Sequence, residues 1–99
     1  MVRSFVFYLI PNFSLLPFAG AIETLRIANR MLGYEAFRWR IASDFAGRVF
    51  SSSGIAIDCD SSLADERRAL MGEKRADLVL VCSGLDVEDY YNKSFDAWL

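Results

Sequence analysis

The sequence contains no histidine, and only two cysteines and two prolines, in 99 residues. Without histidine there is no Ser-His or Cys-His pair of the kind that activates a nucleophile. The chain also contains no Walker loop, no G-x-S-x-G elbow and no G-x-G-x-x-G turn. These absences remove the common catalytic sets and favour binding over catalysis.

Basic residues are too few to form a nucleic-acid-binding surface. Eleven lysines and arginines face 13 acids, for a net charge of −2, whereas a nucleic-acid-binding domain needs a clustered basic face. We interpret the scattered cations as solvated side chains, with a phosphate contact as the alternative. They are Arg38, Arg40, Arg67, Arg68, Lys74 and Arg75.

The two cysteines, Cys59 and Cys82, have no metal-ligand spacing, and we expect no metal and no other cofactor. Cys82 lies in an apolar run, where it is interpreted as a small buried hydrophobe. A reduced, cytoplasmic setting is therefore expected. The apolar run at residues 5–10 is ended by Pro11, too early for a membrane span, so no membrane partner is expected.

Apolar residues are abundant for so short a chain, at 54% of the sequence, with 14% aromatic. The length suits one small domain, and a small domain has proportionally little interior. We therefore expect residues 1–99 to be one part of a larger domain, or to pack on a partner. An apolar end at Leu99, inside an apparent helix, agrees with a fold that is incomplete.

Hydrophobic periodicity predicts an α/β fold with a mostly parallel sheet. Continuous apolar runs at 4–10 and 78–82 are typical of strands covered on both faces, and alternation at 37–43 predicts a strand with one packed face. Between the first two strands in the chain, residues 15–32 have helical spacing, with Ser14 as N-cap and Gly33 as C-cap. Strand, helix and strand form a right-handed parallel unit.

Weaker signals predict the remaining elements. Residues 47–50 and 55–57 flank a turn-rich loop and favour an antiparallel excursion. A short helix is expected from Ser61 or Ser62 to Met71. Beyond residue 84 we expect a turn at 87–91 capped by Asp86, and a helix at 95–99 opened by Ser94.

Two loops form the candidate binding site, provided that the strands at 5–10 and 78–82 are parallel neighbours. Their carboxyl ends then meet at one sheet edge, where α/β proteins bind ligands. The site would offer hydroxyls, backbone donors and a helix N-terminus that favours an anion or carboxylate. The expected ligand-binding residues are Asn12, Phe13, Ser14, Ser83, Gly84 and Leu85. The alternative is that Gly84 merely allows a tight turn after a core strand.

Several segments together resemble a known family. They include FYLIPNFS at 7–14, FAGAIETLRIANR at 18–30, the stretch 34–43, SSG at 52–54 and ADLVLVCSG at 76–84. In this order they resemble the amino-terminal half of the PfpI-like domain in GlxA-type regulators of the AraC family. That domain belongs to the class I glutamine amidotransferase-like superfamily.

The resemblance implies a flavodoxin-like, three-layer α/β sandwich, followed in regulators by a DNA-binding domain beyond these residues. Enzymes of the superfamily carry a nucleophilic cysteine after the turn that matches Ser83-Gly84. Here Pro17 occupies the position of their acidic residue, and Ser83 replaces a glycine. Both departures favour a sensor over an enzyme. Glu23 matches the family, and we interpret it as a structural residue of the helix surface.

The resemblance therefore implies a ligand-sensing domain of a transcriptional regulator without catalytic residues in this chain. Its partners would be a small metabolite (an amino acid or a quaternary amine), a second copy in a homodimer, and DNA only through another domain. One alternative is part of a stand-alone PfpI-like hydrolase, amidase or glyoxalase-type enzyme with a downstream cysteine. The other alternative is a truncated product with no activity of its own.

Overall fold

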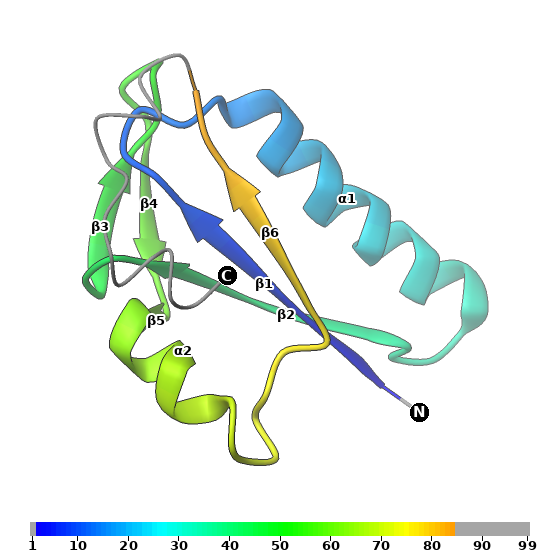
Figure 1. Cartoon of the computed structure of the whole chain (residues 1–99). Helices are drawn as coiled ribbons and strands as arrows, with labels where there is room; N and C mark the ends of the chain where they lie inside the picture. The colour runs from blue at the N-terminus through cyan, green and yellow to red at the C-terminus, as the bar shows by residue number, and fades with distance from the viewer. Residues whose placement is uncertain (1, 85–99) are drawn as a thin grey trace.

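Strand β1 (Arg3–Leu9) is the centre of the fold in the computed structural model, which describes residues 2–84 (Figure 1). It pairs in parallel with β2 (Phe37–Ser43) on one side and with β6 (Leu78–Cys82) on the other. Strand β5 (Ser61–Ser62) extends the sheet beyond β2, giving the order β5-β2-β1-β6. The predicted strands and the parallel pairing of the first with the last are confirmed.

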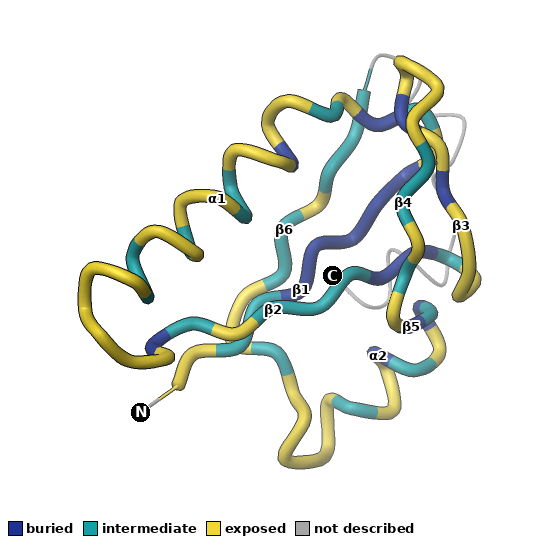
Figure 2. The backbone as a smooth tube through the Cα atoms, turned by 180° about the vertical axis from the view of Figure 1, so that it is seen from behind, coloured by how far each residue is buried: buried dark blue, intermediate teal, exposed yellow. Residues whose placement is uncertain are grey.

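The central strand is covered on both faces (Figure 2). Phe7 and Leu9 belong to one hydrophobic cluster, beneath helix α1, and Val6 and Tyr8 belong to another, on the side of helix α2. All four are at most 1% exposed. Successive side chains of a strand point to opposite faces, so a continuous apolar run supplies both cores. The result is a three-layer, flavodoxin-like α/β arrangement.

Helix α1 (Leu15–Leu32) has the predicted bounds. Ser14 occupies the N-cap position, but its side chain makes no capping hydrogen bond. Gly33 ends the helix in the left-handed region at φ 80°, and its N–H donates to the Asn29 carbonyl at 3.0 Å. The Asn29 side chain also bonds the backbone of Ala36 and Phe37, at 2.9 Å in each case, which fixes the turn into β2.

A separate antiparallel hairpin follows β2, as the sequence predicts. It pairs β3 (Gly47–Phe50) with β4 (Ala56–Cys59). Val49 is buried in the cluster beneath α1, and Ile57 packs against that cluster. The hairpin therefore covers part of the same face of the sheet that α1 covers.

Helix α2 (Leu63–Ala69) covers the opposite face. Ser62 and Asp65 form a reciprocal capping box, with hydrogen bonds of 3.0 and 3.1 Å. The helix ends two residues before the predicted end at Met71, because the Leu70 N–H bonds the Arg67 carbonyl three residues back and tightens the last turn.

Two aspartates continue the hydrogen-bonding pattern beyond the strands. Asp77 accepts from the Ser4 N–H through its side chain at 2.7 Å and donates to the Ser4 carbonyl through its backbone at 2.8 Å. Asp60 does the same with Ile41, at 2.9 and 2.7 Å. Each carboxylate thus helps to set the register of the strand beside it.

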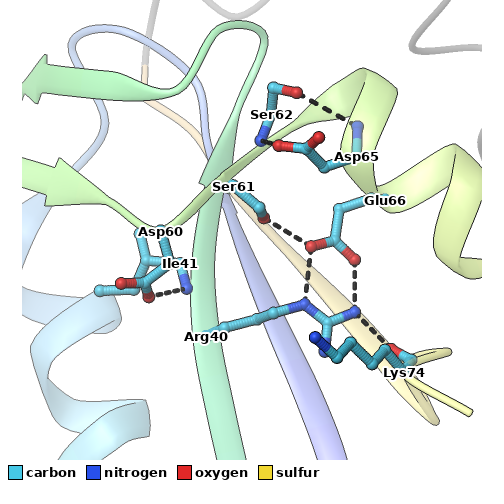
Figure 3. Close-up of polar contacts among 8 residues, drawn as sticks. All are labelled: Arg40, Ile41, Asp60, Ser61, Ser62, Asp65, Glu66 and Lys74. Atoms are coloured by element: carbon cyan, nitrogen blue, oxygen red, sulfur yellow. Dashed lines mark hydrogen bonds and ion pairs between the residues drawn. The ribbon is translucent and has the colours of Figure 1, made fainter.

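The prediction that the basic side chains are solvated is wrong for Arg40. Its guanidinium makes a bidentate ion pair with Glu66 of α2, at 2.6 and 2.7 Å, and bonds the Lys74 carbonyl at 2.7 Å (Figure 3). Glu66 is 3% exposed and also accepts from the Ser61 hydroxyl at 2.5 Å. The pair holds α2 against the sheet, and the hydrogen bond with Glu66 raises the pKa of Arg40.

Strand β6 corrects a second prediction, that this strand is covered on both faces. Leu78 and Val81 are 48% and 38% exposed. Among residues 2–84, β6 is the outer strand of the sheet, with a neighbour only at β1. An outer strand buries less of its apolar side chains than a central one.

The predicted turn at 87–91 and the predicted helix at 95–99 lie outside the described residues, as does Leu85. Within residues 2–84, no helix has both the length and the apolar character needed to cross a membrane.

Replacing Glu66 with alanine is expected to lower the free energy of unfolding by about 3 kcal/mol, because the mostly buried Arg40 loses its carboxylate partner. Urea denaturation of the variant measures the change. The control is Glu23→Ala, which removes an exposed ion pair with Arg26 and should leave the midpoint unchanged. Equal effects of the two substitutions would contradict a structural role for the buried pair.

Candidate functional site

The carboxyl ends of β1 and β6 meet, and the loops that follow them are joined by backbone hydrogen bonds. The Ile10 N–H donates to the Cys82 carbonyl at 3.0 Å, and the Ser14 N–H donates to the Ser83 carbonyl at 3.1 Å. The structure thus brings together five of the six residues predicted to form the site. These are Asn12, Phe13, Ser14, Ser83 and Gly84.

Gly84 is required by a contact within the protein. A Cβ at this position would collide with the backbone carbonyl oxygen of Asn12 and lie 3.8 Å from the Cα of Phe13. Gly84 does not have a positive φ, whereas Asn12 does, at 68°, a conformation that asparagine tolerates. The close approach of the Asn12 backbone explains why residue 84 is a glycine. This explanation does not require a bound ligand.

Phe13 contributes packing at this edge. It is fully buried, and its ring meets that of Phe18 edge-to-face at 5.5 Å. Its carbonyl accepts a hydrogen bond from the Ser52 N–H at 2.9 Å. The side chain of Phe13 therefore anchors the loop after β1 in the core.

The polar groups that remain at the edge are two hydroxyls and the start of α1. Ser14 is exposed and Ser83 is half-buried, and within residues 2–84 neither side chain has a hydrogen-bond partner. The first turn of α1 contains no acidic residue. A helix N-terminus carries partial positive charge and free N–H donors, so the arrangement is suited to a carboxylate or another small anion.

Sequence reasoning missed a buried polar pair at the same edge. The Tyr8 hydroxyl donates to the carboxylate of Asp44, the residue that follows β2. Burial, followed by the hydrogen bond to Asp44, raises the pKa of Tyr8 far above its ordinary value. In the sequence, the signal for this pair is an aspartate that directly follows a strand, and this signal is weak. The pair places a tyrosine and a carboxylate where β1 and β2 end.

The face covered by α2 has a shallow cavity of about 290 Å³, lined by Arg40, Asp60, Ser61, Asp65, Glu66, Ala69 and Lys74. All three of its carboxylates are already bonded, to a backbone N–H, a helix cap or an arginine (Figure 3). We therefore interpret this cluster as structural. Among residues 2–84 no group of three or more His, Cys, Asp or Glu side chains is placed to hold a metal ion.

Both thiols are partly buried, which disfavours their ionised form. Burial raises the pKa of Cys82 to about 11, and burial also raises the pKa of Cys59 above its ordinary value. The reactive species is the thiolate, which is scarce at neutral pH when the pKa is this high. Burial therefore disfavours the thiolate form of both cysteines.

Comparison with known proteins shows that the relatives of this chain are transcriptional regulators. It is 32% identical over 99 residues to the HTH-type transcriptional regulator CdhR of Pseudomonas aeruginosa, and 35% identical over 86 residues to GbdR of the same species. It is 33% identical over 93 residues to GlxA of Rhizobium meliloti. These matches cover 100%, 87% and 94% of the chain.

The chain spans only about a quarter of the length of these relatives, at 27%, 22% and 26%. A crystal structure of an AraC family transcriptional regulator from Pseudomonas putida has the same fold, with a TM-score of 0.72 and 30% identity. That match covers 85% of this chain and 48% of the other. No family model matches the sequence.

The chain is thus homologous to regulators of the AraC-family type, and the resemblance predicted from its sequence is confirmed.

Replacing Gly84 with alanine is expected to destabilise the protein by about 1–3 kcal/mol, because the added Cβ must displace the Asn12 backbone. Gly20→Ala is the matched control. Nothing lies within 4 Å of a Cβ at Gly20, and alanine within a helix is favoured by about 1 kcal/mol over glycine. Chemical denaturation should move the two midpoints in opposite directions, and a shift in the same direction would contradict the contact.

Ionisation of the Cys82 thiol should lower the free energy of unfolding as the pH rises from about 9 to about 11. Because burial raises the pKa of Cys82 from 9.0 to about 11, its contribution is complete below pH 9 and is lost as the pH rises through 11. Urea midpoints for the protein and for Cys82→Val, measured from pH 7 to 11, isolate this group by difference. If the urea midpoints of the two proteins change with pH in the same way, the Cys82 thiol is not shielded from solvent.

Proposed function

We propose that this chain is the amino-terminal part of the effector-binding domain of a transcriptional regulator of the AraC-family type. The relatives named as regulators match it over 87% to 100% of its length, and the Pseudomonas putida regulator shares its fold. DNA binding would reside in another domain of the intact protein, in agreement with the net charge of −2 of this chain.

The proposed effector site is the sheet edge formed by the loops after β1 and β6. The observation that carries this proposal is the joining of the two loops, which places the Ser14 and Ser83 hydroxyls beside the start of α1. A metabolite with a carboxylate would be held by these hydroxyls and by the positive end of the helix. An amino acid or a quaternary amine with a carboxylate has this chemistry.

Binding would act through a homodimer. An effector changes an equilibrium only through its different affinity for two states, so one dimer arrangement must hold it better than the other. The hydrogen bond between the Ser14 N–H and the Ser83 carbonyl provides a means for this change, because a ligand held at Ser14 would also act on the loop after β6. The change in dimer arrangement would then alter affinity for DNA.

Two features favour a sensor over the alternative, part of a PfpI-like enzyme. Pro17 replaces the acidic residue expected near a nucleophile, and a prolyl residue neither accepts nor donates the required proton. The relatives are named as regulators. We therefore favour binding without chemistry at this edge.

Addition of the effector should raise the unfolding free energy of the intact protein by RT ln(1 + [L]/Kd), about 2.7 kcal/mol at 100 times Kd. Thermal unfolding against a panel of amino acids, quaternary amines and their decarboxylated analogues tests this. Carboxylate-containing members should stabilise the protein more than their analogues. The absence of any stabilisation across the panel would count against sensing at this site.

A matched pair of variants tests whether the ligand binds at the N-terminus of α1 or elsewhere. Ser14→Asp places a carboxylate at the N-cap, so it should weaken binding of the identified ligand about 10-fold or more while leaving the protein at least as stable. Thr24→Asp adds the same charge in the middle of α1, about 15 Å further along the helix axis, where screening is strong. Calorimetric titration should show weaker binding only for the first variant.

A further inference from the structure

Strand β6 leaves one edge of the sheet open. Within residues 2–84 it pairs only with β1, so the backbone along its other side has no neighbouring strand there. In a parallel ladder, alternate residues direct their N–H and C=O groups to opposite sides of the strand. About half of the backbone polar groups of β6 therefore point away from β1.

The open edge of β6 has none of the features that keep a permanent edge strand from pairing. Proteins protect such edges with charged side chains, prolines, bulges or very short strands. Strand β6 pairs with β1 in continuous register over five residues, Leu78, Val79, Leu80, Val81 and Cys82, none of them charged and none a proline. Its first and fourth residues are also 48% and 38% exposed. This edge is therefore suited to pair with a further strand.

The opposite edge of the same sheet is a poor place for growth. Strand β5 consists of only two residues, Ser61 and Ser62, and passes directly into α2 at Leu63. Ser62 is already used by the capping box of α2, through both its hydroxyl and its backbone N–H. A further strand is therefore expected at β6.

The lengths of the relatives favour a strand from the same polypeptide. The Pseudomonas putida regulator shares this fold with a TM-score of 0.72, but the match covers only 48% of that chain. CdhR is matched over only 27% of its length. A polypeptide of either length has enough additional residues to supply further strands to this sheet.

A second copy of the chain fits the β6 edge less well. A twofold axis would place β6 of one copy antiparallel to β6 of the other. Every strand pair of the described four-stranded sheet is parallel, and purely parallel sheets are over-represented among proteins. The direction of the existing strands therefore favours a parallel neighbour.

We propose that the open side of β6 pairs with a parallel strand of the same polypeptide that lies beyond residue 99. Parallel neighbours need a crossover connection of about a dozen or more residues, so the partner strand is distant from β6 in the sequence. Its carboxyl end would lie at the edge where β1 and β6 end, and the loop after it would border the proposed effector site. This inference rests on the proposed function, because it locates a further part of the effector-binding domain.

Amide hydrogen exchange of the intact protein without effector tests the pairing, read at single residues by mass spectrometry. A strand with neighbours on both sides has all of its amides bonded, whereas an edge strand leaves alternate amides free. We expect all amides of β6 to be as well protected as those of the central strand β1. Fast exchange at alternate positions of β6, with β1 still protected, would overturn the proposal.

Photo-crosslinking identifies the segment that covers the edge. Benzoylphenylalanine in place of Leu78 should form a crosslink within one polypeptide, to a peptide from beyond residue 99. The same group in place of Met31, which is 82% exposed on α1, is the control and should not link to that peptide. A crosslink from position 78 to a second copy would overturn the proposal. If the substitution at Leu78 prevents folding, hydrogen exchange of the unmodified protein still decides.

The failure of this proposal is distinguishable from the failure of effector sensing. Effector binding is measured by thermal unfolding of the wild-type protein and does not depend on the exchange pattern of β6. Full protection of β6 without stabilisation by any compound would retain the strand pairing and overturn the effector site. Stabilisation by a carboxylate compound with free amides in β6 would do the reverse.

Discussion

Both faces of β1 are covered, so its backbone can form hydrogen bonds only with strands on either side, and β2 and β6 occupy those two positions in parallel. Parallel neighbours cannot be joined by a tight hairpin and need crossover connections. Helix α1 provides the first crossover, and the segment containing the β3–β4 hairpin and α2 provides the second. This arrangement brings the carboxyl ends of all three strands to one edge of the sheet.

The chemistry at that edge is limited by how tightly its loops pack. Backbone bonds join Ser14 to Ser83, and Gly84 lies against Asn12 without room for a side chain. Phe13 is used for packing, so a ligand would depend on hydroxyls and on the N–H groups of α1. Such groups bind and orient an anion. They do not supply an activated nucleophile, which agrees with the identity of the regulator relatives.

The hairpin connects this edge with the outer surface. A two-stranded hairpin is marginally stable alone, and here Val49 and Ile57 attach it to the core while two backbone bonds attach it to residues 12 and 13. Its other side leaves Phe50 exposed. A shift of the loop after β1 would therefore also move the hairpin, because the two are joined by these backbone bonds.

The sequence by itself determined the elements and their order, since period and capping are local: α1 lies at 15–32 as predicted, and the strands at 37–43 and 78–82 have their predicted bounds. Tertiary structure decided the partners of polar side chains. Arg40 meets Glu66 across 26 positions, Asp77 meets Ser4 across 73, and Tyr8 meets Asp44 across 36. No local pattern marks such pairs, because burial and pairing depend on which segments the folded chain brings together. The same reason explains why Leu78 and Val81, apolar like the residues of β1, are left partly exposed on an outer strand.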